Sequence, residues 1–316
     1  MSRAAVIANP AARGGAASLA DDVATALRQG GLDVELLRTA APGDGVAVAR
    51  RVAQDGGADL VVAVGGDGTV REVAQGLAEG LGTWPSGGPA AADAPQLLVV
   101  PAGTGNSMHK ALWDDRPWSS VVDLAVRGAT RRRDLDLLRI EGAEVGSLLG
   151  ASAGFLRWAV EATARFPQLT GRELYTAAGL AAAQELQPFA GRVSVDGQPL
   201  AEGPMALVAV GGARRRGGSL LVLPRSLLGD GRLDVCVLLA GDADEAMAGL
   251  MAAMEGAHLA LPGVRYAQGT EVLLECLDGP LPFEHDGDPW PGDDTALRLR
   301  VVPQAVPVAG PQVWQE

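Results

Sequence analysis

Two glycine-rich loops contain residues that could bind a phosphate group. The first loop, Gly65–Thr69 (GGDGT), follows the apolar run Asp59–Val64, and the second, Gly103–Asn106 (GTGN), follows the apolar run Gln96–Val100. Glycines allow the backbone to approach a phosphate closely, and amides at the N-terminus of a following helix point at the anion. Two such loops at the ends of successive strands are expected to face one crevice, one for each side of a nucleotide.

Asp67 is an unusual residue at the centre of an anion-binding loop. A carboxylate among phosphates is useful if it accepts a proton or helps to hold Mg²⁺. The loop fits neither the Walker pattern nor the dinucleotide pattern GxGxxG, because Arg71 stands where the third glycine should be. On these residues alone an alternative stays open, in which GGDG is a tight turn and Asp67 caps the helix that follows.

A third segment with candidate chemistry lies near the C-terminus. Residues Phe283–Pro289 read FEHDGDP, in which Asp286-Gly287 is a hairpin turn pattern and Asp288 is a second carboxylate. Taken by itself, this segment favours an exposed turn. Metal-ligand spacing is lacking at the three histidines, His109, His258 and His285.

The elements around the first two loops alternate between strand and helix patterns. Strands are predicted at Ala4–Asn9, Asp33–Thr39, Asp59–Val64 and Gln96–Val100, and helices at Ser18–Gln29, Gly43–Gln54 and Thr69–Glu79. Repeated βα units predict a doubly wound parallel α/β domain over residues 1–125.

The second half has a different pattern, with short β-branched runs between turn residues. Strands are predicted at Asp134–Ile140, Arg192–Val195, Met205–Val210, Arg232–Leu239, Thr270–Cys276 and Ala296–Val302. Helices are predicted at Phe155–Phe166, Glu173–Gln187 and Ala243–His258. This spacing predicts an antiparallel β-sandwich or barrel domain over residues 126–302.

Composition limits the class of protein. The chain has 316 residues, 47% of them hydrophobic, and a formal net charge of −12. An acidic surface repels phosphate backbones, so we expect no nucleic acid partner. Cys236 and Cys276 are expected to be buried reduced thiols, which suits a cytoplasmic protein. The N-terminal apolar run is too short for a signal peptide and no run approaches 18 apolar residues, so we expect a soluble protein that could be peripheral at a membrane.

In this order, the segments resemble the diacylglycerol kinase catalytic family, which includes soluble bacterial lipid kinases and is related to the sphingosine and ceramide kinases. The resemblance covers essentially the whole chain. It rests on Asn9-Pro10, Thr39 with Gly43-Asp44, GGDGT with Glu72 and Gly76, GTGN, Gly154-Phe155, the segment Gly217–Val235 and Asp286–Asp288. GGDG alone is shared with NAD kinases and phosphofructokinases, whereas GTGN and the later segments are more discriminating.

The resemblance implies an N-terminal NAD kinase-like domain, a C-terminal β-sandwich domain and a final segment, residues 303–316, that returns to the first domain. It also implies that ATP binds in the first domain. The implied nucleotide-binding residues are Asn9, Thr39, Gly65, Gly66, Asp67, Gly68, Thr69, Val70, Arg71, Glu72, Gly103, Thr104, Gly105 and Asn106.

The resemblance also implies a metal ion and a catalytic base. A Mg²⁺ ion would be held by the carboxylate of Asp230 and the backbone carbonyls of Leu227 and Arg232. Asp288 matches the general base, which is normally Glu in the family, and Asp67 would organise the phosphates and the catalytic Mg²⁺. The chain also departs from the family at Arg71 and at Ser107–Lys110, which follow the two glycine-rich loops.

The implied function is an ATP-dependent lipid kinase that transfers the γ-phosphoryl group to the hydroxyl of diacylglycerol or a related lipid at a membrane surface. The alternatives are an NAD kinase-like enzyme with a soluble substrate and a non-catalytic nucleotide- or lipid-binding homologue. A homodimer is an open alternative to a monomer. The basic triplet Arg214–Arg216 is a candidate membrane contact, although such triplets are commonly solvated loop ends.

Overall fold

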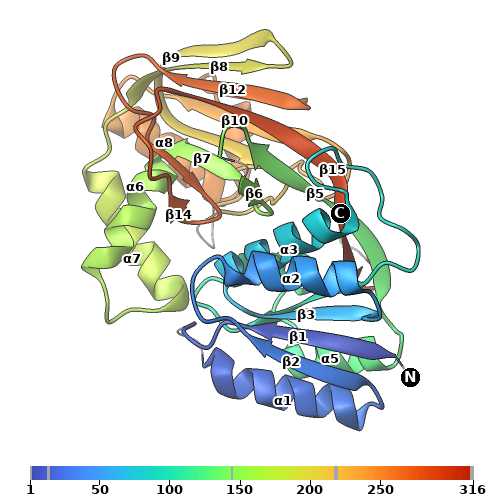
Figure 1. Cartoon of the computed structure of the whole chain (residues 1–316). Coiled ribbons are helices and arrows are strands. Elements are labelled where there is room, and N and C mark those ends of the chain that lie inside the picture. The colour runs from blue at the N-terminus through green and yellow to red at the C-terminus, as the bar shows by residue number, and fades with distance from the viewer. Residues whose placement is uncertain (1, 13–14, 144, 217–219, 314–316) are drawn as a thin grey trace. The chain divides into compact units, whose positions relative to one another are not determined.

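A computed structural model describes residues 2–12, 15–143, 145–216 and 220–313 of the chain (Figure 1). Contacts divide the chain into two compact units, which we call the first unit (Met1–Leu137 with Val302–Glu316) and the second unit (Leu138–Val301). The sequence-based boundary near residue 125 coincides with the end of helix α5, Trp118–Val126. The structural division lies inside strand β5, Arg131–Ile140, because this strand runs from one unit into the other.

The first unit contains a parallel sheet in the order β2-β1-β3-β4. Its strands are β1 (Arg3–Ala8), β2 (Asp33–Arg38), β3 (Leu60–Gly65) and β4 (Gln96–Pro101). Val62 of β3 lies beside Val6 of β1 and Leu98 of β4, and all three side chains are buried. Burial on both faces explains why these strands are continuous apolar runs. The last strand, β15 (Ala296–Gly310), returns to this sheet, where Val308 pairs with Leu97 in parallel.

Helices cover both faces of this parallel sheet (Figure 1). Helices α2 (Asp44–Asp55) and α3 (Asp67–Leu81) pack together on one face, and α1 (Ala16–Gln29) and α5 lie on the other. A short helix, α4 (Ser107–Trp113), follows β4. The carboxyl ends of β2, β3 and β4 therefore lead into α2, α3 and α4, and the first unit has the doubly wound architecture that the sequence predicts.

The second unit is an antiparallel β-structure. Its strands are β6 (Val145–Ser147), β7 (Ala151–Gly154), β8 (Phe189–Val195), β9 (Gln198–Gly211), β10 (Leu233–Leu239), β11 (Val264–Gly269), β12 (Glu271–Cys276), β13 (Phe283–His285), β14 (Asp288–Pro289) and the first part of β15. The long strand β9 pairs with β7, β8 and β10. Strand β7 has the sequence ASAG, which lacks β-branched residues, so the sequence pattern did not predict it.

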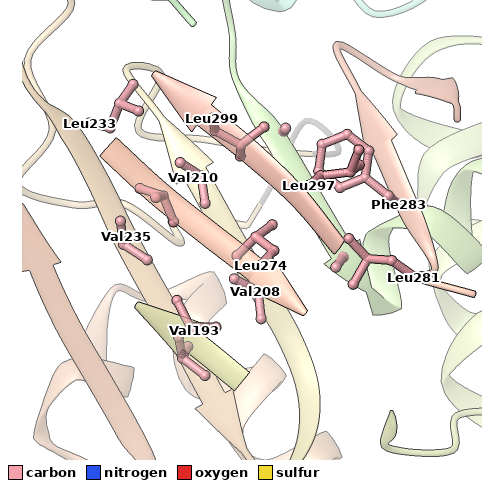
Figure 2. Close-up of a cluster of buried hydrophobic side chains, with 14 of the residues drawn as sticks. Val193, Val208, Val210, Leu233, Val235, Leu274, Leu281, Phe283, Leu297 and Leu299 are labelled. Atoms are coloured by element: carbon pink, nitrogen blue, oxygen red, sulfur yellow. The ribbon is translucent and has the colours of Figure 1, made fainter. Parts of the chain in front are cut away.

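Two apolar clusters lie in the second unit. The first contains inward-facing residues of the strands, including Val208, Val235, Leu274 and Phe283 (Figure 2). The second lies where helices α6 (Phe155–Ala162), α7 (Gly171–Gln184) and α8 (Ala243–Met254) contribute apolar side chains. These bounds are shorter than the predicted helices, because 3₁₀ turns follow α6 at Thr163–Arg165 and α8 at Ala257–Ala260.

Both cysteines are buried free thiols, as the sequence predicted. Burial raises the pKa of the Cys236 thiol to about 12. Within the described ranges of the chain, we find no helix that combines the length and apolar character needed to cross a bilayer.

Candidate functional site

Asp67 joins the two glycine-rich loops of the first unit. It is the first residue of α3, whose N-cap residue is Gly66. Its carboxylate accepts the backbone N–H groups of Ser107 and Met108, both at 3.0 Å, at the start of α4. The Asp67 carboxylate therefore links the first residue of α3 to the start of α4.

The two loops also touch through their backbones. A Cβ atom on Gly103 would lie 2.3 Å from the Cα atom of Gly66, a distance that side chains do not tolerate. Glycine is therefore required at residue 103 for the loops to lie this close. The loops after β3 and β4 are thus held edge to edge at the carboxyl end of the sheet, where α/β folds bind ligands.

Glu72 connects the same helix to the loop after β2. Its two carboxylate oxygens accept the backbone N–H groups of Gly43 at 2.9 Å and Gly45 at 3.0 Å. Asp44 in turn accepts the amides of Ala40 and Ala41, both at 2.8 Å. Glu72, predicted as a nucleotide-binding residue, is thus engaged in holding the loop that precedes α2.

The GTGN loop is stabilised by side chains from within it and from α4. Asn106 accepts the Gly103 amide at 2.8 Å and donates to the Gly103 carbonyl at 2.9 Å. Lys110 donates to the carbonyl oxygen of Gly105 at 2.9 Å. His109 is buried, with its ring nitrogens near the carbonyl oxygens of Val99 and Arg116. Lys110 and His109 therefore fix the loop and the start of α4.

The remaining predicted nucleotide-binding residues lie in or beside these loops. Asn9 follows β1, where its side chain accepts the Ala11 amide at 2.9 Å. Thr39 follows β2 and is buried, and its backbone N–H donates to the carbonyl oxygen of Ala8 at 2.9 Å. Predicted residues in the first two turns of α3 are Gly68, Thr69, Val70 and Arg71, of which Thr69 and Val70 are buried. Thr104 lies between Gly103 and Gly105 in the partly exposed GTGN loop.

The predicted metal ligands belong to the second unit. Oδ1 of Asp230 accepts the Arg232 amide at 3.0 Å. Burial raises the pKa of Asp230, and the charge of Asp234 adds to this rise while the Arg232 hydrogen bond opposes it. Among the described residues, no group of three or more His, Cys, Asp or Glu side chains could hold a metal. One carboxylate and the carbonyls of Leu227 and Arg232 are hard oxygen donors, which fits a Mg²⁺ ion that keeps several waters.

The predicted hairpin forms in the second unit. Asp286 and Gly287 have φ angles of 51° and 85° and connect β13 to β14. The Asp286 carboxylate accepts four hydrogen bonds, of 2.7 to 3.2 Å. The donors are Ser147 Oγ and the backbone amides of Leu148, Leu149 and Gly150. This carboxylate anchors the turn to the segment before β7.

Asp288 is the first residue after this turn, and it is exposed. It pairs with His285, which is buried and makes an edge-on contact with the Trp290 ring at 6.0 Å. Paired residues of neighbouring strands point to the same face of a sheet. Asp288 therefore lies at the surface, directly after a turn that the Asp286 carboxylate fixes.

Three polar residues next to the hairpin are buried, which the sequence patterns did not predict: Glu284, Ser152 and Arg216. Glu284 is 4% exposed, and it accepts hydrogen bonds from Ser152 Oγ and, at 2.8 Å, from the Gly287 amide. Arg216 is 6% exposed and interacts electrostatically with Glu284 and Asp286. Because Arg216 is buried, it is not available for the membrane contact predicted for the triplet Arg214–Arg216. Gly217-Gly218, which follow this triplet, lie outside the described residues. Glu284 is part of the FEHDGDP segment. Its strand, β13, has only three residues, which is too short for an alternation of apolar and polar residues to predict which side chains are buried.

Comparison with known proteins identifies the family. Residues 3–138 match the diacylglycerol kinase catalytic domain, and residues 150–310 match the YegS C-terminal NAD kinase beta sandwich-like domain. The chain belongs to the diacylglycerol kinase catalytic-domain family. Membership of this lipid kinase family implies ATP as a substrate.

Relatives of this family are similar over most of their length. A "Probable lipid kinase YegS-like" of Stenotrophomonas maltophilia is 31% identical over 255 residues, which are 74% of this chain and 74% of that protein. A protein of the same name from Pseudomonas aeruginosa is 28% identical over 90% of this chain and 86% of its own.

Solved structures confirm the NAD kinase-like fold. A putative diacylglycerol kinase from Bacillus anthracis superposes with a TM-score of 0.73 at 18% identity, covering 98% of this chain and 97% of its own. Yeast NADH kinase superposes with a TM-score of 0.51 at 10% identity, covering 99% of this chain and 84% of its own. At these identities the likeness concerns the fold alone.

Proposed function

We propose that this protein is an ATP-dependent lipid kinase that transfers the γ-phosphoryl group to a hydroxyl of diacylglycerol or a related lipid. The observation that carries this proposal is the pair of glycine-rich loops held together by Asp67 in a chain of a lipid kinase family. Their backbone amides lie at the carboxyl ends of β3 and β4, where a phosphate chain is best accommodated.

In the proposed reaction, ATP is the phosphoryl donor and Asp288 provides the base. The loops Gly65–Thr69 and Gly103–Asn106 hold the phosphates, and Asp67 keeps the loops in register. The lipid hydroxyl oxygen attacks the γ-phosphorus, the bond to the β-phosphate oxygen breaks and ADP leaves. Asp288 accepts the proton that the hydroxyl loses. Such reactions depend mainly on positioning and charge neutralisation.

Mg²⁺ is part of the proposal at two places. One ion would neutralise charge on the phosphates, and Asp67 would help to organise it. A second, structural ion would be held by the Asp230 carboxylate and the carbonyls of Leu227 and Arg232, an all-oxygen set of the kind that Mg²⁺ prefers. The acceptor is a membrane lipid, so we propose that the protein works at a bilayer surface.

The test is an incubation with γ-labelled ATP, Mg²⁺ and separate preparations of diacylglycerol, sphingosine, ceramide and NAD. Label in the organic phase supports the proposal, whereas label on NAD supports the soluble-substrate alternative. Nucleotide binding without turnover supports a non-catalytic homologue.

Two variants test the assigned roles. Asp67→Ala and Asp288→Ala are each expected to abolish lipid phosphorylation while the protein stays folded by circular dichroism. Glu202→Gln is the matched control, since Glu202 is an exposed carboxylate whose partner is Arg192 at 2.9 Å. Near-native turnover in either alanine variant would remove the role given to that residue.

A further inference from the structure

Glu284 is a buried carboxylate on the opposite face of the hairpin from Asp288. Glu284 pairs with Ser152 and Pro289. Ser152 in turn pairs with Ala209, which belongs to the apolar cluster to which helices α6, α7 and α8 contribute. Asp288 pairs with His285, and neighbouring residues of a strand point to opposite faces. Glu284 therefore does not share the surroundings of Asp288 and cannot replace it as a base at the same place.

Arg216 is built into the same region. A Cβ atom on Gly150 would lie 2.0 Å from the Arg216 Nη2 atom, and one on Gly211 would lie 2.9 Å from it. Only glycines leave room for the guanidinium at this place. Nη2 donates to the Val210 carbonyl at 3.1 Å. The fold thus places a buried cation beside Glu284 and Asp286.

Burying the charges of Arg216 and Glu284 together is not expected to raise the free energy of unfolding. Burial raises the pKa of Glu284, which shows that the site opposes its ionisation in spite of Arg216. The Nε atom of Arg216 is also buried, and within the described part of the chain it has no hydrogen-bond partner. Buried ion pairs are commonly no more stable than apolar residues of similar volume, and the best-supported reason to retain one is structural specificity.

The carboxylates of Asp286 and Glu284 fix the backbone conformation of the turn. Asp286 holds three amides and a hydroxyl of residues 147–150, and Glu284 holds the amide of Gly287. The turn is therefore fixed from both of its sides. Asp288 is bonded directly to Gly287, so any freedom at the Gly287 amide would move its carboxylate.

We propose that Glu284 is a positioning residue for the Asp288 carboxylate, acting through its hydrogen bonds to the Gly287 amide and the Ser152 hydroxyl. This inference rests on the proposed function, because it assumes that Asp288 receives the proton of the lipid hydroxyl. A displacement of about 1 Å at a catalytic group can reduce a rate by about 100-fold.

The kinetic test compares Glu284→Met with Glu284→Gln. Methionine has a similar volume but accepts no strong hydrogen bond, so it removes the contact with Gly287. Glutamine can accept from the Gly287 amide and donate to Ser152 after the hydroxyl rotates. We expect Glu284→Met to lower kcat by about 10-fold or more with KM for ATP unchanged. We expect Glu284→Gln to retain kcat within about twofold.

A second measurement does not depend on activity. Amide hydrogen exchange should become faster at Gly287 in Glu284→Met and stay unchanged in β8 and β12. If Glu284→Met fails to fold, Ser152→Ala removes the other hydrogen bond of Glu284 and should give a smaller loss of kcat. Glu202→Gln serves again as the control and should change neither readout.

Three results would overturn the inference: unchanged kcat in Glu284→Met, an equal defect in Glu284→Gln, or unchanged exchange at Gly287. A wild-type protein that phosphorylates no lipid is a different outcome. That result removes the proposed function itself, whereas an active wild type with an unaffected Glu284→Met variant removes only the positioning role.

Discussion

The loops of the first unit and the hairpin of the second unit use the same device in different surroundings. In both, carboxylates accept backbone amides from a segment that is distant along the chain, as Asp67 does for α4 and Asp286 does for residues 148–150. Asp67 and Glu72 are partly exposed, whereas Glu284 is buried.

The two regions differ in the groups that surround their carboxylates. Asp67 and Glu72 accept amides at the starts of α4 and α2, where the helix dipole favours a negative charge. Glu284 is buried, and Arg216 interacts with it from a place where Gly150 and Gly211 leave room for the guanidinium group. The buried turn thus differs from the loops in having a buried cation, Arg216, next to its carboxylates.

The largest effect is expected from Arg216→Met. This change leaves Glu284 and Asp286 without their cation, and breaking a buried charge pair typically costs about 3 kcal/mol of unfolding free energy. Urea denaturation measures the loss. The double variant Arg216→Met/Glu284→Met should recover part of it, and a double variant as unstable as Arg216→Met would contradict the assigned pairing.

A smaller effect is expected from Gly103→Ala in the first unit. The added methyl group collides with the Gly66 backbone, so the two glycine-rich loops must separate. We expect ATP affinity to fall by about 10-fold, or about 1.4 kcal/mol, without loss of the fold. Titration calorimetry with ATP measures this change. Gly279→Ala is the matched control, since a Cβ atom there meets nothing within 4 Å and the residue lies outside both glycine-rich loops.

The smallest effect concerns the pH dependence of stability. Burial raises the pKa of Glu284, so the folded state binds this proton more tightly than the unfolded state does. The stability that protonated Glu284 contributes is present below its unfolded pKa and is lost as the pH rises through its folded pKa. The free energy of unfolding of the wild type should therefore fall, relative to that of Glu284→Gln, as the pH rises from the unfolded to the folded pKa of Glu284. Urea denaturation at a series of pH values measures this difference. A pH-independent difference between the two proteins would contradict this expectation.

Local patterns predicted most of the elements around the site. The apolar run before GGDGT is β3, and the run before GTGN is β4, because strands buried on both faces must be apolar throughout. The pair Asp286-Gly287 predicted the hairpin, since both residues adopt positive φ readily. Strand β7 was missed because its small residues fit between neighbours and show no alternation.

The sequence by itself determined the two-part organisation, the positions of the glycine-rich loops and the family. Only the tertiary structure decided what the polar side chains hold. Asp67 holds the start of α4, and Glu284 is buried beside Ser152 and Arg216. Periodicity and turn residues report contacts between near neighbours in the chain. Hydrogen bonds such as that between Ser152 and Glu284 join residues 132 positions apart, and only the folded chain brings them together.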